Sequence, residues 1–420
     1  MNGKGLPKGV KSVPAVAVAA AVVLLGWMAF AVWPGLLLAV GILDYGRWFL
    51  DSYAVLAASD AVRQGLDPTA ANPLDPLLRN HKYSDWWYAI RWLGLTRADN
   101  FLLGLVWVAG FAVMAWWTAL PKNFRESVWL AVFLLSPPVI LAVSRANNDL
   151  VIFALLAAAG VAAASAARSR QVLAVGLLAV ATGLKFYPVV AAGALLWVGP
   201  LRRRPLLLLL AAAVCGAALA SVWPQMVRGQ FHVDASLHTM GAAILGRDLG
   251  LGDTTARGLA VLLIGAGGVL LAAGGFTTGL ATRGDERLRL LSAMGLIVLL
   301  ACFVAGMSYA YRWIFALWMA LWLWRQLEDA DLTRRARRTV LVAVVLLAAC
   351  LWLDGLLGFS VNVVLPPVSM DKLEPLQHHW RLVTQPLHWL LMALFAGWLG
   401  EAVMVLVRDW RDSRKPAAAN

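Results

Sequence analysis

The first long apolar segment of the chain is followed directly by residues 43–76, which read LDYGRWFLDSYAVLAASDAVRQGLDPTAANPLDP. This stretch carries five aspartates among aromatic and arginine residues, namely Asp44, Asp51, Asp60, Asp67 and Asp75. A carboxylate at the point where a chain leaves a bilayer is a solvated loop residue, a helix cap or part of a functional site. The other segments of the chain help to choose among these three interpretations.

Composition predicts an all-α polytopic membrane protein. Hydrophobic residues make up 61% and charged residues 14% of the 420 residues. The apolar residues come in blocks of roughly 13 to 30, the range in which membrane-spanning helices lie. We expect a single integral membrane domain, 1–420, with about twelve spans at 13–43, 101–120, 128–143, 150–167, 171–184, 186–199, 205–223, 259–278, 290–306, 314–324, 340–357 and 386–407.

The distribution of lysine and arginine predicts the orientation. These residues are retained on the cytoplasmic side, and an N-terminus placed inside puts most of the 36 basic residues there. Both termini are then cytoplasmic, and the long segments 44–100, 224–258 and 358–384 are outer loops. This orientation accounts for the net charge of +13, so membrane lipids rather than nucleic acid are the expected partners.

No cofactor or metal is expected from the cysteines. The three cysteines, Cys215, Cys302 and Cys350, all lie inside apolar blocks. There they behave as small hydrophobic residues and provide neither a disulfide framework nor a zinc-binding spacing.

The first outer loop is predicted to contain a helix from Asp51 to Gln64, ended by Gly65. Small apolar residues share one arc of this helix, and the polar residues Ser59, Asp60, Arg63 and Gln64 share the other. This pattern is typical of a helix lying along the membrane interface. Asp51 falls on the small-residue side, where it is either an N-cap or a general base. Asp60, Asp67 and Asp75 are expected to be surface or turn residues.

Three further polar groups occur at predicted outer ends of spans. Arg145, Asn147, Asn148 and Asp149 precede the fourth span, where capping is the alternative to a functional role. Lys185 and Tyr187 form the tip of a hairpin whose arms of about 14 residues are short for a full crossing, which favours a protein-lined cavity over simple snorkelling. Tyr309, Tyr311 and Arg312 follow the ninth span, where an aromatic belt would explain the tyrosines but not the arginine.

Three cations therefore lie at the outer ends of different spans, near an acidic loop: Arg145, Lys185 and Arg312. Basic side chains in a low-dielectric site stabilise phosphate charge. We expect a site that binds an anionic lipid head group beside an available carboxylate.

The order of these motifs resembles the GT-C membrane glycosyltransferases, specifically glycosyltransferase family 87. The resemblance rests on D-S-Y at 51–53 with a helix ending in G-L-D-P, N-N-D opening a span, L-K-F-Y-P in a short hairpin, and a late Y-R-W. It covers roughly residues 44–313 and implies a GT-C-like helical bundle. It also implies a catalytic base in the first loop, for which Asp51 is the best match and Asp44 a weaker rival.

The resemblance implies that Asn148 and Asp149 shape the site and that Lys185 and Arg312 serve the donor phosphate. The full set of candidate substrate-binding residues is Tyr53, Arg145, Asn147, Asn148, Asp149, Lys185, Tyr187, Tyr309, Tyr311 and Arg312. The implied donor is a polyprenyl-phosphate sugar, with mannose as the first candidate, and the acceptor is a lipid or glycan at the outer face of a bacterial cytoplasmic membrane. A monophosphate leaving group does not require a divalent cation.

Two other function classes remain open at this point. A transporter or flippase also buries charges, although its polar groups are typically found at mid-span. A ligase or polymerase that uses polyprenyl-diphosphate-linked glycans also works at the outer face, and it would be expected to carry its long loop nearer the C-terminal half.

Overall fold

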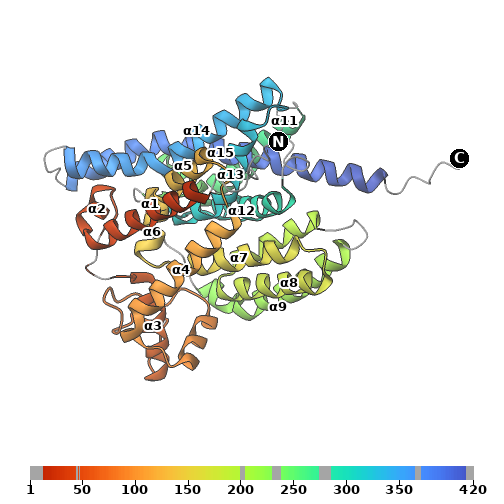
Figure 1. Cartoon of the computed structure of the whole chain (residues 1–420). Helices are drawn as coiled ribbons and strands as arrows, with labels where there is room; N and C mark the ends of the chain where they lie inside the picture. The colour runs from red at the N-terminus through yellow and green to blue at the C-terminus, as the bar shows by residue number, and fades with distance from the viewer. Residues whose placement is uncertain are drawn as a thin grey trace, which may run out of the picture.

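The computed structural model describes residues 13–43, 46, 48–198, 204–228, 238–273, 285–364 and 370–412. These residues are almost entirely helical, as Figure 1 shows. The longer α-helices are α1 (Val13–Val32), α4 (Asn100–Thr118), α7 (Asp149–Ala163), α8 (Arg168–Leu184), α9 (Arg204–Arg228), α11 (Asp253–Ala273), α12 (Glu286–Val304), α14 (Arg334–Phe359) and α15 (Met370–Asp412).

Shorter elements connect them. They are α2 (Pro34–Ala39), α3 (Leu50–Arg63), α5 (Phe124–Leu134), α6 (Pro137–Ser144), α10 (Ala242–Asp248), α13 (Leu317–Glu328), the 3₁₀ helices η1 (Asp85–Leu93), η2 (Arg97–Asp99), η3 (Tyr187–Trp197) and η5 (Ala310–Ala316), and the π-helix η6 (Ser360–Val364). Two short antiparallel strands, β1 (Thr239–Met240) and β2 (Ser308–Tyr309), pair Thr239 with Tyr309 and Met240 with Ser308.

Seven helices in the described part of the chain are long and apolar enough to cross a membrane. An eighth results if α5 and α6, which bend by 60° at their junction, count as one broken span. The predicted count of twelve is therefore not confirmed. The difference comes from short apolar segments: α7 and η3 have 15 and 11 residues, whereas a straight crossing needs about 20.

The described residues of two predicted outer loops are mostly helical. In segment 224–258, α9 continues to Arg228, α10 follows and α11 begins at Asp253. In segment 358–384, η6 extends α14, and α15 already begins at Met370. The apolar pattern missed these extensions because their helices also contain prolines and charged residues, for example Pro224 and Pro375.

The first loop folds as a small unit beside the helical bundle, around α3, η1 and η2 (Figure 1). Helix α3 forms where it was predicted, but its polar arc is only partly exposed to solvent, because Ser59 and Asp60 are buried whereas Arg63 and Gln64 are exposed. Asp60 accepts hydrogen bonds from the backbone and side chain of Arg97. The prediction that Asp60 is a surface residue is therefore wrong, whereas Asp67 is exposed and accepts the backbone N–H of Thr69 in a turn.

The 3₁₀ helix η1 packs this unit against the C-terminal end of α8. The indole N–H of Trp87 donates to the carbonyl oxygen of Leu184 at 3.0 Å, and the Trp86 ring covers Gly183. Gln225 of α9 donates to Asp85 at 2.6 Å. These contacts fix the first loop over the residue that follows α8, Lys185.

Gly183→Ala should therefore destabilise the protein, because a Cβ atom there would meet the Trp86 ring at 2.3 Å. We expect a cost of about 1–3 kcal/mol from this overlap, measured by thermal unfolding in detergent. Gly176→Ala in the same helix is the matched control, because its Cβ would meet nothing within 4 Å. Alanine should be neutral or stabilising there, and equal effects of the two substitutions would contradict the packing.

Candidate functional site

Asp51 does not cap helix α3. The N-cap position is Phe49, which has a left-handed backbone with φ 57°, and Asp51 lies in the first turn with its carboxylate directed elsewhere. Its backbone N–H donates to the carbonyl oxygen of Arg145 at 2.9 Å. The N-cap interpretation was therefore wrong, and the side chain faces the segment that joins α6 to α7.

The Asp51 carboxylate has three donors. Oδ1 accepts from Arg145 Nη2 at 2.9 Å and from Arg79 Nη1 at 3.2 Å. Oδ2 accepts from Asn147 Nδ2 at 2.6 Å. With only 3% of its surface exposed, Asp51 is a buried carboxylate held from three sides.

The ordinary effect of burial on this acid is overcome by its partners. Burial alone would raise the pKa of Asp51. The charges of Arg145 and Arg79 and the hydrogen bond from Asn147 lower this pKa, and together they outweigh the effect of burial. The pKa therefore lies below its ordinary value. Asp51 is ionised at neutral pH and can accept a proton, although as a weak base while both arginines are bound.

Sequence reasoning missed Arg79. Its Nε and Nη2 donate to Asp75 at 2.8–3.2 Å, and Nη2 also donates to the carbonyl oxygen of Leu50 at 2.7 Å. Asp75, predicted as a surface or turn residue, is buried with 2% exposure. The spacing of Asp75 and Arg79 (i, i+4) in an acidic loop could have indicated their ion pair. The contact of Arg79 with Asp51 comes from tertiary packing, which the sequence does not show.

A second charged cluster surrounds Asp149, the first residue of α7. Its Oδ1 accepts hydrogen bonds from Lys185 Nζ and from the Tyr187 hydroxyl, the latter at 2.7 Å. Lys185 also donates to Asn148 Oδ1 at 2.6 Å. Arg312 Nε lies 3.8 Å from Asp149 Oδ2. The expectation that Lys185 points into the protein is confirmed, since only 7% of it is exposed.

Asn147 joins the two clusters. Its Nδ2 donates to Asp51, while its Oδ1 accepts the backbone N–H of Asp149 at 2.9 Å. The predicted capping role of this segment thus belongs to Asn147, because Asn148 occupies the N-cap position without a side-chain cap bond. One amide fixes Asp51 relative to the start of α7.

Tyrosine rings lie next to the cationic side chains of both clusters. Lys185 Nζ lies 5.3, 5.9 and 5.7 Å from the ring centres of Tyr83, Tyr187 and Tyr311. The Arg145 guanidinium lies 5.9 Å from the ring centre of Tyr309, which stacks on Tyr311. Each pair is within cation–π range. Tyr83 is a further residue that sequence reasoning missed.

The segment that carries Tyr309 to Arg312 is positioned by strand pairing. Gly241 and Gly306 flank the strands, both with φ 137°, and a Cβ on Gly241 would meet the carbonyl oxygen of Gly306 at 1.8 Å. Close approach of the two backbones therefore needs glycine. The aromatic-belt interpretation is wrong for Tyr311, which is buried.

The structure brings nine of the predicted residues into the two clusters around Asp51 and Asp149: Arg145, Asn147, Asn148, Asp149, Lys185, Tyr187, Tyr309, Tyr311 and Arg312. Tyr53 lies half-buried on α3. Asp44 lies outside the described residues. Within the described part of the chain, no group of three or more His, Cys, Asp or Glu residues could hold a metal ion.

The second cluster carries more positive than negative charge. Lys185 and Arg312 share the single carboxylate of Asp149, and Arg312 lies with its guanidinium over the Tyr187 ring at 4.9 Å. The buried Nδ2 of Asn148 has no hydrogen-bond partner. Unsatisfied buried donors and uncompensated cations are costly, so this arrangement suits an anionic ligand.

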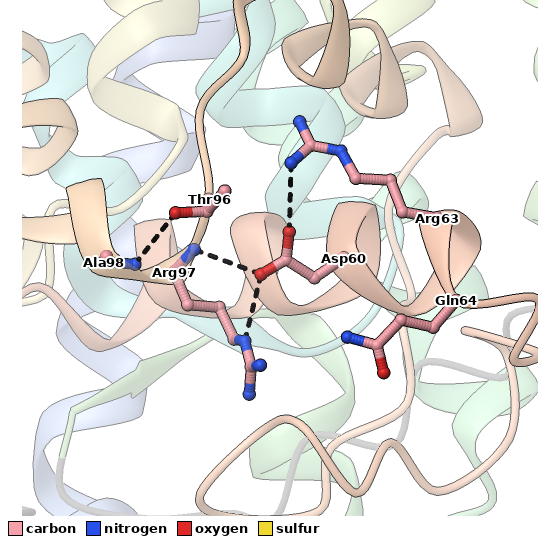
Figure 2. Close-up of a pocket in the computed structure, with 6 residues that line it drawn as sticks. All are labelled: Asp60, Arg63, Gln64, Thr96, Arg97 and Ala98. Carbon is pink, nitrogen blue, oxygen red and sulfur yellow. Dashed lines mark hydrogen bonds and ion pairs between the residues drawn. The ribbon is translucent and has the colours of Figure 1, made fainter.

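A hollow of about 430 Å³ lies at the other end of α3, as Figure 2 shows. It is lined by Asp60, Arg63, Gln64, Thr96, Arg97 and Ala98. Both arginines in it already pair with Asp60. None of the predicted site residues lines this hollow, so its arginines serve as controls for those of the charged clusters.

Comparison with known proteins identifies no relative of this chain. No protein family, curated protein or solved structure matches it. A functional interpretation therefore depends on the geometry of the two clusters and on the motifs that first pointed to them.

Asp149→Asn should strongly destabilise the protein, because it leaves Lys185 buried without a counter-charge. Removing one partner of a buried ion pair costs about 3–5 kcal/mol, which thermal unfolding in detergent would detect. The double variant Asp149→Asn, Lys185→Met removes the orphaned charge and should recover part of this loss. Additive losses in the double variant would show that the two side chains do not depend on each other.

Proposed function

We propose that the protein is a membrane glycosyltransferase of the GT-C type that transfers a sugar from a polyprenyl-phosphate donor to a lipid or glycan acceptor. The observation that carries this proposal is the buried link from Asp51 through Asn147 to the cation-rich cluster of Lys185 and Arg312. It combines a carboxylate that can accept a proton with cations that can hold a phosphate. The motif resemblance to family 87 supports the same assignment, with mannose as the first sugar to test.

The reaction needs one base and one stabilised leaving group. Asp51 accepts the proton of the acceptor hydroxyl as its oxygen forms a bond to the anomeric carbon of the donor. The bond from that carbon to the phosphate oxygen breaks, and the electron pair leaves with the lipid phosphate. Lys185 and Arg312 stabilise the charge that develops there. A single displacement of this kind inverts the anomeric configuration.

The lipid donor agrees with a membrane protein. The seven candidate spans lie before, between and after the site residues in the sequence. The prenyl tail of the donor would enter between helices, and its phosphate-sugar head group would bind at the two charged clusters. As part of this proposal, the site faces the outer side of a bacterial cytoplasmic membrane and both termini are cytoplasmic. The short and bent helices complete a bundle of about twelve membrane segments, and α3 lies near the interface.

Asp51→Asn should abolish transfer by the inserted protein, and the rate is compared per amount of folded protein because this substitution also removes the counter-charge of Arg145. Loss of general-base assistance costs about 10²–10⁴-fold in rate. The assay incubates membranes with radiolabelled polyprenyl-phosphate mannose and follows lipid-linked product. Near-normal transfer by this variant would remove Asp51 from the mechanism, and loss in Asp44→Asn alone would assign the role to Asp44. Uptake of the label without a new bond would indicate a transporter, and transfer only from a diphosphate-linked donor would indicate a ligase or polymerase.

Lys185→Ala and Arg312→Ala should raise the apparent KM for the donor more than that for the acceptor, because their charges meet the donor phosphate. Arg63→Ala, in the hollow of Figure 2, is the matched control and should change neither value. The measurement is initial transfer rate against concentration of each substrate. An equal effect of all three substitutions would place the phosphate elsewhere.

A further inference from the structure

The two arginines that bind Asp51 are themselves held very differently. Arg79 donates to both oxygens of Asp75 and to the carbonyl oxygen of Leu50, as well as to Asp51 at 3.2 Å. Its guanidinium would stay in place if the contact with Asp51 were lost. Arg79 is therefore a fixed part of the site.

Among the described residues, Asp51 is the one hydrogen-bond partner of the Arg145 side chain. Its Nη2 donates to Asp51 Oδ1 at 2.9 Å, and its buried Nε has no acceptor. The guanidinium otherwise lies over the ring of Tyr309, and 22% of the side chain is exposed. Rotation of Arg145 would therefore break one hydrogen bond and could satisfy a second donor.

The same aromatic pair lies beside Arg145 and beside the second cluster. Tyr309 contacts Arg145, and Tyr311, which stacks on it at 5.6 Å between ring centres, contacts Lys185. Asn147 links the Asp51 carboxylate to the backbone N–H of Asp149. A phosphate bound by Lys185 and Arg312 would thus approach the guanidinium of Arg145 across a stacked pair of rings.

We propose that Arg145 exchanges partners when the donor binds: the guanidinium of Arg145 leaves Asp51 and pairs with the donor phosphate. This inference rests on the proposed function and deepens it. Planar guanidinium groups bind carboxylates and phosphates with the same fork of donors, so one side chain can serve either anion. Arg79 and Asn147 keep Asp51 in position during the exchange.

The exchange couples donor binding to activation of the base. Asp51 is bound by Arg79 from the first loop and by Arg145 and Asn147 from the segment before α7. Its charge also acts on Tyr83, Lys185 and Tyr311. Loss of the Arg145 charge would make the carboxylate a better proton acceptor. The enzyme would then gain a stronger base when a lipid phosphate is bound. Arg145 both binds the donor phosphate and controls the basicity of Asp51 in this scheme.

Binding of a polyprenyl monophosphate without sugar tests the exchange without turnover. Its Kd is measured by titration calorimetry on the full chain in lipid nanodiscs, with the uncharged polyprenol as a control for binding of the tail. Because Asp51 competes with phosphate for Arg145, Asp51→Asn should tighten binding about tenfold, a coupling within the usual range. The same substitution should still tighten binding about tenfold in an Arg79→Gln background.

In an Arg145→Gln background, Asp51→Asn should tighten monophosphate binding only about threefold or less, because only the removal of repulsion between the Asp51 carboxylate and the phosphate remains. Arg145→Met replaces this background if the glutamine variant does not fold. An equal gain with and without Arg145 overturns the exchange while leaving the proposed function intact. If the unaltered protein binds the monophosphate no better than the polyprenol, the proposed function fails, and the exchange fails with it.

Discussion

The geometry of the charged site depends on the side-chain amide of Asn147. It donates to Asp51 and accepts from the backbone of Asp149, so it ties the first loop to the start of α7. Both ends of the amide are used in a place where only 1% of the residue is exposed. Buried polar networks hold a unique arrangement only when their members are satisfied, and this amide satisfies one member of each charged cluster.

The helical class could be predicted from the sequence, but the number of membrane crossings could not. Apolar windows identify helices, whereas crossing depends on length and on bends such as the 60° break between α5 and α6. Short helices like η3 are as apolar as the longer helices that could cross a membrane. The length of a helix and its bends depend on long-range packing, which is not visible in local hydropathy.

The residues of the candidate site likewise fall into those that could be predicted from the sequence and those that could not. Asp51, Lys185 and Arg312 were predictable because charges beside apolar segments are costly and stand out from the local pattern. Arg79, Tyr83 and the buried state of Asp75 were not, because their loop looks like an ordinary polar connection in sequence. Only tertiary contacts, such as Trp87 with the carbonyl oxygen of Leu184, bring that loop onto the hairpin.

Tight aromatic packing behind the site explains why Arg312 can be held without a full ion pair. The 3₁₀ helix that carries it continues into Trp313 and Phe315, both fully buried, and Phe153 of α7 stacks on Trp318 at 4.4 Å. In a membrane, helix association depends on close packing because lipid is as apolar as the side chains. Gly295 allows such an approach, since a Cβ there would meet the carbonyl oxygen of Phe315 at 2.1 Å. Packing of α7 and α12 against η5 thus fixes Arg312 near Asp149 at 3.8 Å, a distance that leaves its donors available to a phosphate.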